Sequence, residues 1–276
     1  MGDVEKTQGG FKAPGQVYGA DYGQPPTGGA VVVQPGYDGS VQPGQYGGSI
    51  PMTTMPQGVP MNCPPGLEYL TQIDQILVYQ KRQFSEMLCG CERKNEYRLC
   101  NSMGQQIYHA QEDTGFWNRQ CCGRMRPFAM HLRDNSEREV LTIKRPYRCE
   151  GCCCFCCLME IQVYTADGVL LGGVNQTWSL IFPRFDIRNA EDETILKMDG
   201  PCCHCRCCSD INFDVKSLDK STTVGRVTKQ WAGMVTEAFT DADNFGITFP
   251  MDLDVKMKAV MIGAMFLIDF MFFERD

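Results

Sequence analysis

An acidic segment near the end of the chain has part of the spacing of a calcium-binding loop. Over residues 241–252, aspartates stand at the first, third and twelfth positions and a glycine at the sixth, namely Asp241, Asp243, Asp252 and Gly246. EF-hand loops place carboxylates and a turn glycine at these positions. The fifth position is Phe245 and the twelfth is the shorter Asp, so calcium would be held weakly, with a Kd on the order of 10⁻⁴–10⁻³ M. The alternative is an ordinary turn, with Asp252 as the N-cap of a following helix.

Two dense groups of cysteines are the second feature that could carry chemistry. They hold eleven of the 17 cysteines: Cys149, Cys152, Cys153, Cys154, Cys156 and Cys157 in the first group, and Cys202, Cys203, Cys205, Cys207 and Cys208 in the second. Pairs three apart have the spacing of zinc sites, but the runs do not single out four ligands. Adjacent cytosolic thiols beside the basic segment 144–148 suit S-palmitoylation, which would anchor the chain to a membrane. Acylation is the favoured interpretation, and metal binding is the alternative.

The composition divides the chain into an arm and one larger domain. Residues 1–65 contain 14 of the 28 glycines and 10 of the 15 prolines, a composition that cannot bury a core. We expect a disordered arm there, and because it lacks a PxxP core, weak multivalent binding is favoured over docking to SH3 domains. The net charge of −7 argues against a nucleic-acid-binding protein. No signal peptide is visible and the cysteine count is odd, so we expect a reducing cytosol.

The larger domain has the alternating polar and apolar pattern of short antiparallel strands. Turn residues separate the members of each expected pair. The expected strands are 97–100, 106–109, 128–132, 140–143, 161–164, 169–171, 185–187, 194–196, 211–215 and 245–249. Strands this short and this numerous predict a mainly β sandwich or barrel.

One segment, 255–273, is helical in composition and apolar on every side. Its apolar run, 259–273, is 15 residues long, shorter than the roughly 20 that span a bilayer. At about 1.5 Å per residue this run would be about 23 Å long, which suits the lumen of a closed barrel. A helix that is apolar all round is either a membrane span or the centre of a core, and here the length favours the core. Asp269, within the segment, would be costly at bilayer depth.

These features together resemble the phospholipid scramblase family. The resemblance rests on four segments: 62–70 (NCPPGLEYL), the cysteine run 152–157, the acidic segment 241–252, and 254–264 (DVKMKAVMIGA). It implies a tubby-like fold, in which a closed barrel of about twelve antiparallel strands surrounds the C-terminal hydrophobic helix 255–273. The expected domain is then 66–276, behind the arm 1–65.

The resemblance also implies a function. It is calcium-dependent, ATP-independent and bidirectional phospholipid scrambling between membrane leaflets, rather than bond-making catalysis. Calcium is placed on Asp241, Asp243, Phe245, Ile247, Phe249 and Asp252, the apolar residues acting through their backbone carbonyls, and palmitate is placed on Cys152, Cys153, Cys154, Cys156 and Cys157. One short helix offers lipid headgroups no polar route, so activity would require oligomers or a thinned bilayer. The alternative is a palmitoylated adaptor without intrinsic scrambling, which binds signalling proteins through its arm.

Localisation and partners follow from the same resemblance. We expect the protein at the cytoplasmic face of the plasma membrane, held by palmitate, by a single-pass type II C-terminal helix, or by both. A nuclear-import segment of some members matches 225–231, where only Arg226 and Lys229 are basic, so nuclear entry is expected only without acylation. The three histidines, His109, His131 and His204, are scattered and pair with no readable nucleophile, which argues against an enzyme. The partners to consider are phospholipid membranes, further copies of the chain and signalling proteins, and not nucleic acid.

Overall fold

The computed structural model describes residues 62–81, 94–122, 125–148, 158–201, 211–230 and 244–274. All of them belong to the compact unit Gly47–Asp276, which is distinct from the unit Met1–Tyr46. The expected arm 1–65 therefore lies almost wholly outside the described residues, as do both cysteine groups. Cys63 and Leu67 pack on the core, so the described fold begins slightly before residue 66.

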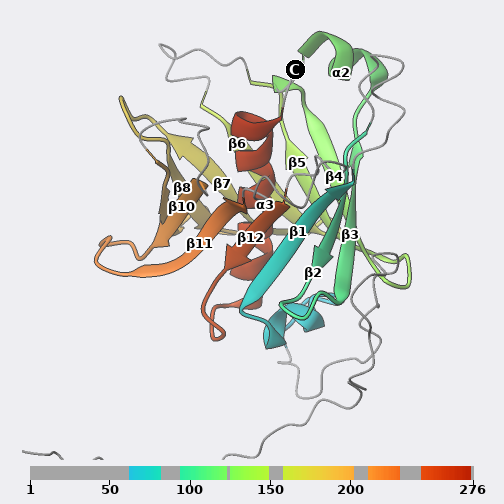
Figure 1. Cartoon of the computed structure of the whole chain (residues 1–276), viewed down its shortest axis with the longest axis horizontal. Helices are drawn as coiled ribbons and strands as arrows, with labels where there is room; N and C mark the ends of the chain where they lie inside the picture. The colour runs from blue at the N-terminus through green and yellow to red at the C-terminus, as the bar shows by residue number, and fades with distance from the viewer. Residues whose placement is uncertain are drawn as a thin grey trace, which may run out of the picture. The chain divides into compact units, whose positions relative to one another are not determined.

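Twelve antiparallel strands close into a barrel around a central helix (Figure 1). The strands are β1 (Gln75–Lys81), β2 (Glu96–Cys100), β3 (Gln106–Asp113), β4 (Phe128–Asp134), β5 (Glu139–Arg145), β6 (Glu160–Thr165), β7 (Leu170–Thr177), β8 (Arg184–Asn189), β9 (Thr194–Asp199), β10 (Ile211–Lys216), β11 (Thr223–Gln230) and β12 (Asn244–Thr248). Each strand pairs with the next along the chain, and β1 pairs with β12 to close the cylinder. None of these twelve strands is an edge strand, so the sheet offers no row of unpaired backbone N–H and C=O groups with which another chain could pair. The expected closed barrel of about twelve strands is confirmed.

Local turn chemistry explains the hairpins. Gly104 and Gly168 have φ angles of 77° and 81°, the left-handed region that glycine enters without strain, and each lies in a tight turn between paired strands. All ten expected strands are present, with bounds that differ by a few residues. The structure adds four elements that the pattern did not indicate: β1, β11, η1 (Glu68–Gln72) and α2 (Phe116–Cys122).

The helix α3 (Val255–Ile268) occupies the lumen and continues as the π-helical turn η4 (Asp269–Phe273). Together they have the bounds of the expected helix 255–273. Every residue from 257 to 271 is buried, which confirms the interpretation of a core helix. The single-pass topology implied by the resemblance is not the arrangement in this structure, where the strands cover the apolar faces of the helix. Within the described ranges, no helix combines the length and the hydropathy needed to cross a bilayer.

Specific contacts fix the start and the middle of α3. Asp254 is the N-cap, since its Oδ1 accepts hydrogen bonds from the backbone N–H groups of Lys256 at 2.8 Å and Met257 at 3.4 Å. The alternative assignment of Asp252 as the cap is wrong. In the middle of the helix, a β-carbon on Gly263 would lie 2.7 Å from Cγ2 of Val163 in β6. Glycine at this position therefore lets the helix lie directly against the barrel wall.

Lys258 is a fully buried cation near the start of α3. Its Nζ donates hydrogen bonds to the backbone carbonyl oxygens of Leu70 at 3.0 Å, Ile73 at 2.9 Å and Met251 at 2.8 Å. Nζ also lies 5.1 Å from the centre of the Phe249 ring. Burial lowers the pKa of Lys258 from its ordinary value. These contacts join the helix to η1, to the residue that follows η1 and to the turn that follows β12.

We expect Lys258→Met to lower the free energy of unfolding by roughly 2–4 kcal/mol, because three buried carbonyl groups lose their donor. Lys256→Met is the matched control, since Lys256 is exposed and lies two residues earlier in the same helix. Urea denaturation followed by tryptophan fluorescence measures the difference. Equal stability of the two variants would contradict the role assigned to Lys258.

Candidate functional site

The two ends of the barrel can be told apart by the central helix (Figure 1). We call the end where α3 begins the N-terminal rim and the end where η4 finishes the C-terminal rim. Because the sheet is a meander, every odd-numbered strand ends at the C-terminal rim and every even-numbered strand begins there. The six connections of this rim are 82–95, 114–127, 146–159, 178–183, 200–210 and 231–243.

Most of the sequence-predicted site residues belong to connections of the C-terminal rim. The first cysteine group stands between β5 and β6, the second between β9 and β10, and Asp241 and Asp243 between β11 and β12. These residues lie outside the described part of the chain, and strand order shows only that the segments containing them start and end at this rim. Palmitoylation of Cys152, Cys153, Cys154, Cys156 and Cys157 stays a prediction.

The described members of the predicted calcium set lie along a strand rather than around a loop. Phe245 and Ile247 belong to β12, which pairs with β1 on one side and β11 on the other, and Phe249 follows directly. All three side chains are buried in the core. Pairing on both sides directs the backbone carbonyls of this strand toward its neighbours in the sheet.

Asp252 lies beyond the end of β12, in the exposed turn that leads to α3 at the N-terminal rim. The five residues of β12 span about 13 Å, whereas calcium holds its oxygen ligands at about 2.3–2.6 Å. The strand thus separates Asp252 from the segment before Asn244. Three or more His, Cys, Asp or Glu side chains do not gather as a metal site anywhere in the described ranges. With β12 paired in this way, the described members of the set do not form one calcium site.

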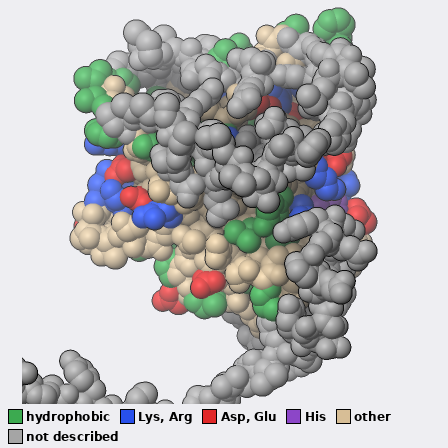
Figure 2. All heavy atoms as spheres, viewed as in Figure 1, with side chains coloured by type: hydrophobic (Ala, Val, Ile, Leu, Met, Phe, Trp, Pro, Cys, Tyr) green, Lys and Arg blue, Asp and Glu red, His purple; other side chains and the backbone are tan. Residues whose placement is uncertain are grey.

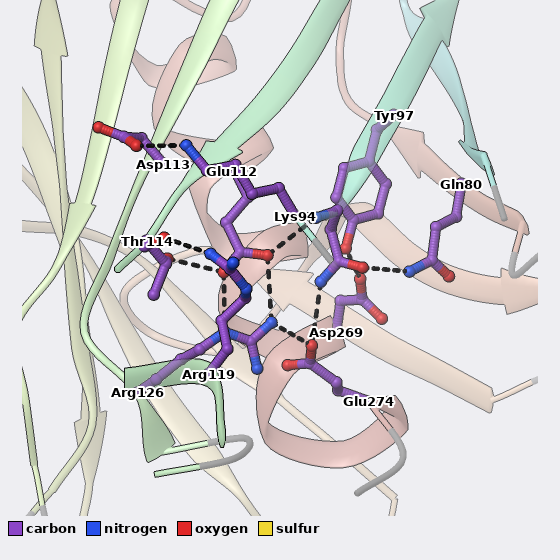
Figure 3. A network of polar contacts seen from close by, with 11 residues as sticks. Gln80, Lys94, Tyr97, Glu112, Asp113, Thr114, Arg119, Arg126, Asp269 and Glu274 are labelled. Atoms are coloured by element: carbon purple, nitrogen blue, oxygen red, sulfur yellow. Dashed lines mark hydrogen bonds and ion pairs between the residues drawn. The ribbon is translucent and has the colours of Figure 1, made fainter. Parts of the chain in front are cut away.

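A buried network of charged side chains lies at the C-terminal rim, around the end of the helix (Figure 3). Arg126 donates two hydrogen bonds to Glu112, from Nε to Oε1 at 2.7 Å and from Nη2 to Oε2 at 3.1 Å. Glu112 also accepts from Thr114 Oγ1 at 2.7 Å and from the backbone N–H of Asn95 at 3.0 Å. The side chains of Arg126 and Glu112 are both almost completely buried. This two-bond pairing compensates two charges that would be very costly to bury alone.

Glu274, which follows η4, joins the same network. Its Oε1 accepts hydrogen bonds from Nη2 of Arg126 and from Nδ2 of Asn95, the second at 3.0 Å. Asp269, the first residue of η4, accepts a hydrogen bond from the Tyr97 hydroxyl at 2.7 Å. These contacts tie the end of the helix to β2 and β3, as Lys258 ties its beginning to the opposite rim.

Burial and charge together set the protonation of the network. Burial alone would raise the pKa of Glu112, but the hydrogen bonds and charge of Arg126 bring it below its usual value. Burial raises the pKa of Glu274 to about 8; Arg126 opposes this shift, and Asp269 and Glu112 add to it. The network therefore has a structural role: it acts as a clasp that holds the end of the helix to the barrel. It contains one carboxyl group that titrates near neutral pH.

Sequence reasoning had singled out only Asp269 in this network, as an ionisable residue in an apolar helix. The carboxylates and the guanidinium that surround it come from segments far apart in the chain. No local spacing connects them, so the network becomes visible only when the barrel brings β2, β3 and η4 together.

Comparisons with known proteins agree on one family. The family model described as Scramblase matches residues 53–275. Phospholipid scramblase 1 of Rattus norvegicus is 54% identical over 262 residues, which cover 95% of this chain and 76% of that protein. Phospholipid scramblase 1 of Homo sapiens is 56% identical over 225 residues (82% of this chain, 70% of that protein), and phospholipid scramblase 2 of Homo sapiens is 52% identical over 255 residues (92% and 84%). No solved structure matches the chain.

The raised pKa of Glu274 predicts a pH-dependent stability. The folded state binds this proton more tightly than the unfolded state, so the contribution is present below the ordinary pKa of 4.5 and is lost as pH rises toward about 8. Glu274→Gln keeps an oxygen acceptor for Arg126 and Asn95 but cannot ionise. Relative to the native protein, we expect this variant to gain on the order of 1–3 kcal/mol between pH 5 and pH 8.5.

Urea denaturation at a series of pH values measures this gain. Glu191→Gln serves as the control, because Glu191 is an exposed glutamate in the turn between β8 and β9. A stability difference between Glu274→Gln and the native protein that stays constant with pH would contradict the assigned titration.

Proposed function

The chain belongs to the phospholipid scramblase family, and on that basis we propose that it moves phospholipids between the two leaflets of a membrane. The observation that carries this proposal is the family match over residues 53–275, which includes the whole barrel and its central helix. We further propose that the movement is bidirectional, needs no ATP and depends on calcium. The activity is then translocation of a lipid and not bond-making chemistry.

The enclosed helix sets a physical condition on this function. A lipid headgroup that crosses hydrocarbon needs a polar route, whereas α3 presents apolar side chains to the surrounding strands. The active state would therefore differ from the closed barrel, either through separation of strands or through association of several copies. The seam between β1 and β12 is a natural place for separation, because no hairpin joins these two strands.

In this proposal calcium acts at β12. Asp241 and Asp243 precede the strand and Asp252 follows it, so a single ion that gathered all three would require β12 to leave its place between β1 and β11. Displacement of β12 would uncover the start of α3, which follows it in the chain. The carbonyls of Phe245, Ile247 and Phe249 would become available as ligands only in such a state.

A second function fits the closed barrel as it stands. With residues 257–268 of α3 buried, the domain would serve as an adaptor without intrinsic scrambling. Palmitate on Cys152, Cys153, Cys154, Cys156 and Cys157 would hold it at the cytoplasmic face of the plasma membrane, and the arm 1–65 would bind signalling proteins. Scrambling by the pure protein separates the two proposals.

We expect the purified full chain, reconstituted in liposomes, to exchange a labelled phospholipid between leaflets faster with calcium than without it. Asp241→Ala combined with Asp252→Ala should remove most of the calcium-dependent part, because two of three carboxylates are lost. The matched control is Asp167→Ala with Glu191→Ala, which removes two exposed carboxylates from hairpin turns of the N-terminal rim.

Amide hydrogen exchange gives a second readout that does not depend on activity. Calcium should speed exchange in β1 and β12 of the native chain and leave both strands unchanged in the Asp241→Ala, Asp252→Ala variant. Exchange of lipid that is absent with and without calcium would favour the adaptor. Scrambling that calcium stimulates equally in the variant would exclude these carboxylates as the calcium site.

Acylation is tested in cells. We expect substitution of Cys152, Cys153, Cys154, Cys156 and Cys157 by serine to abolish hydroxylamine-sensitive palmitate labelling and to weaken attachment to the plasma membrane, because each buried methylene of an acyl chain contributes about 0.8 kcal/mol to anchoring. Cys121→Ser with Cys122→Ser is the control, since these free cysteines belong to α2 at the same rim. Full palmitate labelling of the five-serine variant would place acylation elsewhere.

A further inference from the structure

Exposed apolar side chains are distributed unevenly between the two rims. In the described residues, the C-terminal rim exposes seven large ones: Phe116, Trp117, Tyr147, Trp178, Leu180, Ile181 and Phe182. Two of them lie on α2, one follows β5, and four lie in the short connection between β7 and β8. The N-terminal rim exposes four, Met103, Val169, Leu218 and Met251, and each stands alone in a separate connection.

The apolar side chains of the C-terminal rim are well exposed to solvent. Leu180 is 82% exposed and Trp117 is 75% exposed. Figure 2 shows hydrophobic side chains at both upper corners of the molecule. Single exposed apolar residues need no explanation, but four within the five residues 178–182, with two more on α2 of the same rim, indicate a surface that binds something.

The two rims also differ in charge, and the N-terminal rim is the more acidic of the two. The described connections of the N-terminal rim carry ten acidic residues (Glu68, Asp74, Glu137, Asp167, Glu191, Asp192, Glu193, Asp219, Asp252 and Asp254) against two basic ones (Arg138 and Lys220). Those of the C-terminal rim carry four basic residues (Lys94, Arg119, Arg126 and Arg148) against one acidic residue, Glu274. Over the six complete connections of the C-terminal rim, the sequence has eight basic and seven acidic residues. Three of the basic residues, Lys94, Arg126 and Arg148, are ion-paired with carboxylates of the adjoining strands, so the C-terminal rim is close to neutral. An anionic surface would therefore repel the acidic N-terminal rim more than the C-terminal rim.

We propose that the C-terminal rim docks the domain on a phospholipid bilayer by inserting the side chains of α2 and of the β7–β8 connection between the headgroups. The apolar residues belong to three successive odd-to-even connections of the barrel, β3–β4, β5–β6 and β7–β8, and this spread along the rim fits a lipid surface better than a single partner helix. Tryptophan is enriched at membrane interfaces because its ring is amphipathic, and this rim exposes two. The inference rests on the proposed function, since it identifies the surface through which the domain meets its lipid substrate. It requires neither calcium nor acylation.

The geometry also explains why docking and acylation would reinforce one another. The segment that contains Cys152–Cys157 connects β5 to β6 at this rim, and Tyr147 precedes it in the same connection. Insertion of Tyr147 among the headgroups would bring the end of β5, from which this segment continues, to the membrane, and a palmitoyl chain on one of its thiols would then keep the rim in place. Two weak attachments on one surface bind far more firmly than either alone.

The test uses the full chain made in bacteria, where it carries no palmitate, with a calcium chelator present. Flotation with vesicles of phosphatidylcholine and phosphatidylserine measures binding. We expect the native chain to float with these vesicles, and Trp117→Ser combined with Leu180→Ser and Ile181→Ser to reduce the partition coefficient at least about tenfold. The matched control is Val169→Ser with Leu218→Ser and Met251→Ser, which removes three exposed apolar side chains from the other rim and should bind as the native chain does.

Two results of the flotation assay would overturn the inference, and a third would reassign the surface. Native protein that stays unbound, or two triple variants that float equally, would show that the rim does not dock on lipid. A C-terminal rim variant that floats normally but loses self-association in sedimentation would assign the surface to a second copy of the chain. Scrambling is assayed separately on protein already reconstituted in vesicles. Rim-dependent flotation without any scrambling would refute the proposed function and leave the docking surface standing.

Discussion

The structure depends on one constraint: α3 has no polar side, so every face of it must be covered. A closed sheet is the arrangement that covers a helix all round, and a twelve-stranded barrel leaves a lumen that a single helix fills. The two polar groups at the helix ends then need partners inside the protein. Lys258 finds three backbone carbonyls at one rim, and Asp269 finds the Tyr97 hydroxyl at the other. The helix is thus held at both ends by hydrogen bonds and along its length by packing.

Much of this fold could be read from residue patterns. Period-two alternation and turn glycines such as Gly168 indicated ten strands, and the all-round apolar composition of 255–273 indicated a buried helix of those bounds. Strand β11 was not predicted because, among its described side chains, only Val227 is fully buried. The others show little alternation of polar and apolar residues. The clasp around Arg126 and Glu274 could not be read at all, since its members meet only through barrel closure. The N-cap was misassigned to Asp252 because Asp252 and Asp254 stand two positions apart. Spacing alone does not show at which of the two aspartates the helix begins.

The calcium set illustrates a different limit of pattern reasoning. Residues 241–252 satisfy several positions of a ligand loop, yet the alternation of Phe245, Ile247 and Phe249 in the same segment also satisfies a strand. Burial of those three side chains in the core outweighs loop formation in the closed barrel, since each contributes roughly 1.5–3 kcal/mol of apolar transfer. One segment therefore carries two conflicting patterns. That conflict is what makes β12 the proposed moving part of the molecule.

The pairing of β1 with β12 has a consequence for how the protein is made. These strands are the first and last of the sheet, so the ribosome completes eleven strands before the twelfth can close the ring, and the helix that fills the lumen emerges later still. Until then the inward faces of the strands have nothing to pack against. Contacts between such distant parts of a chain form slowly, and the waiting apolar surface is prone to aggregate. The core of this domain thus cannot be completed until its last helix has left the ribosome.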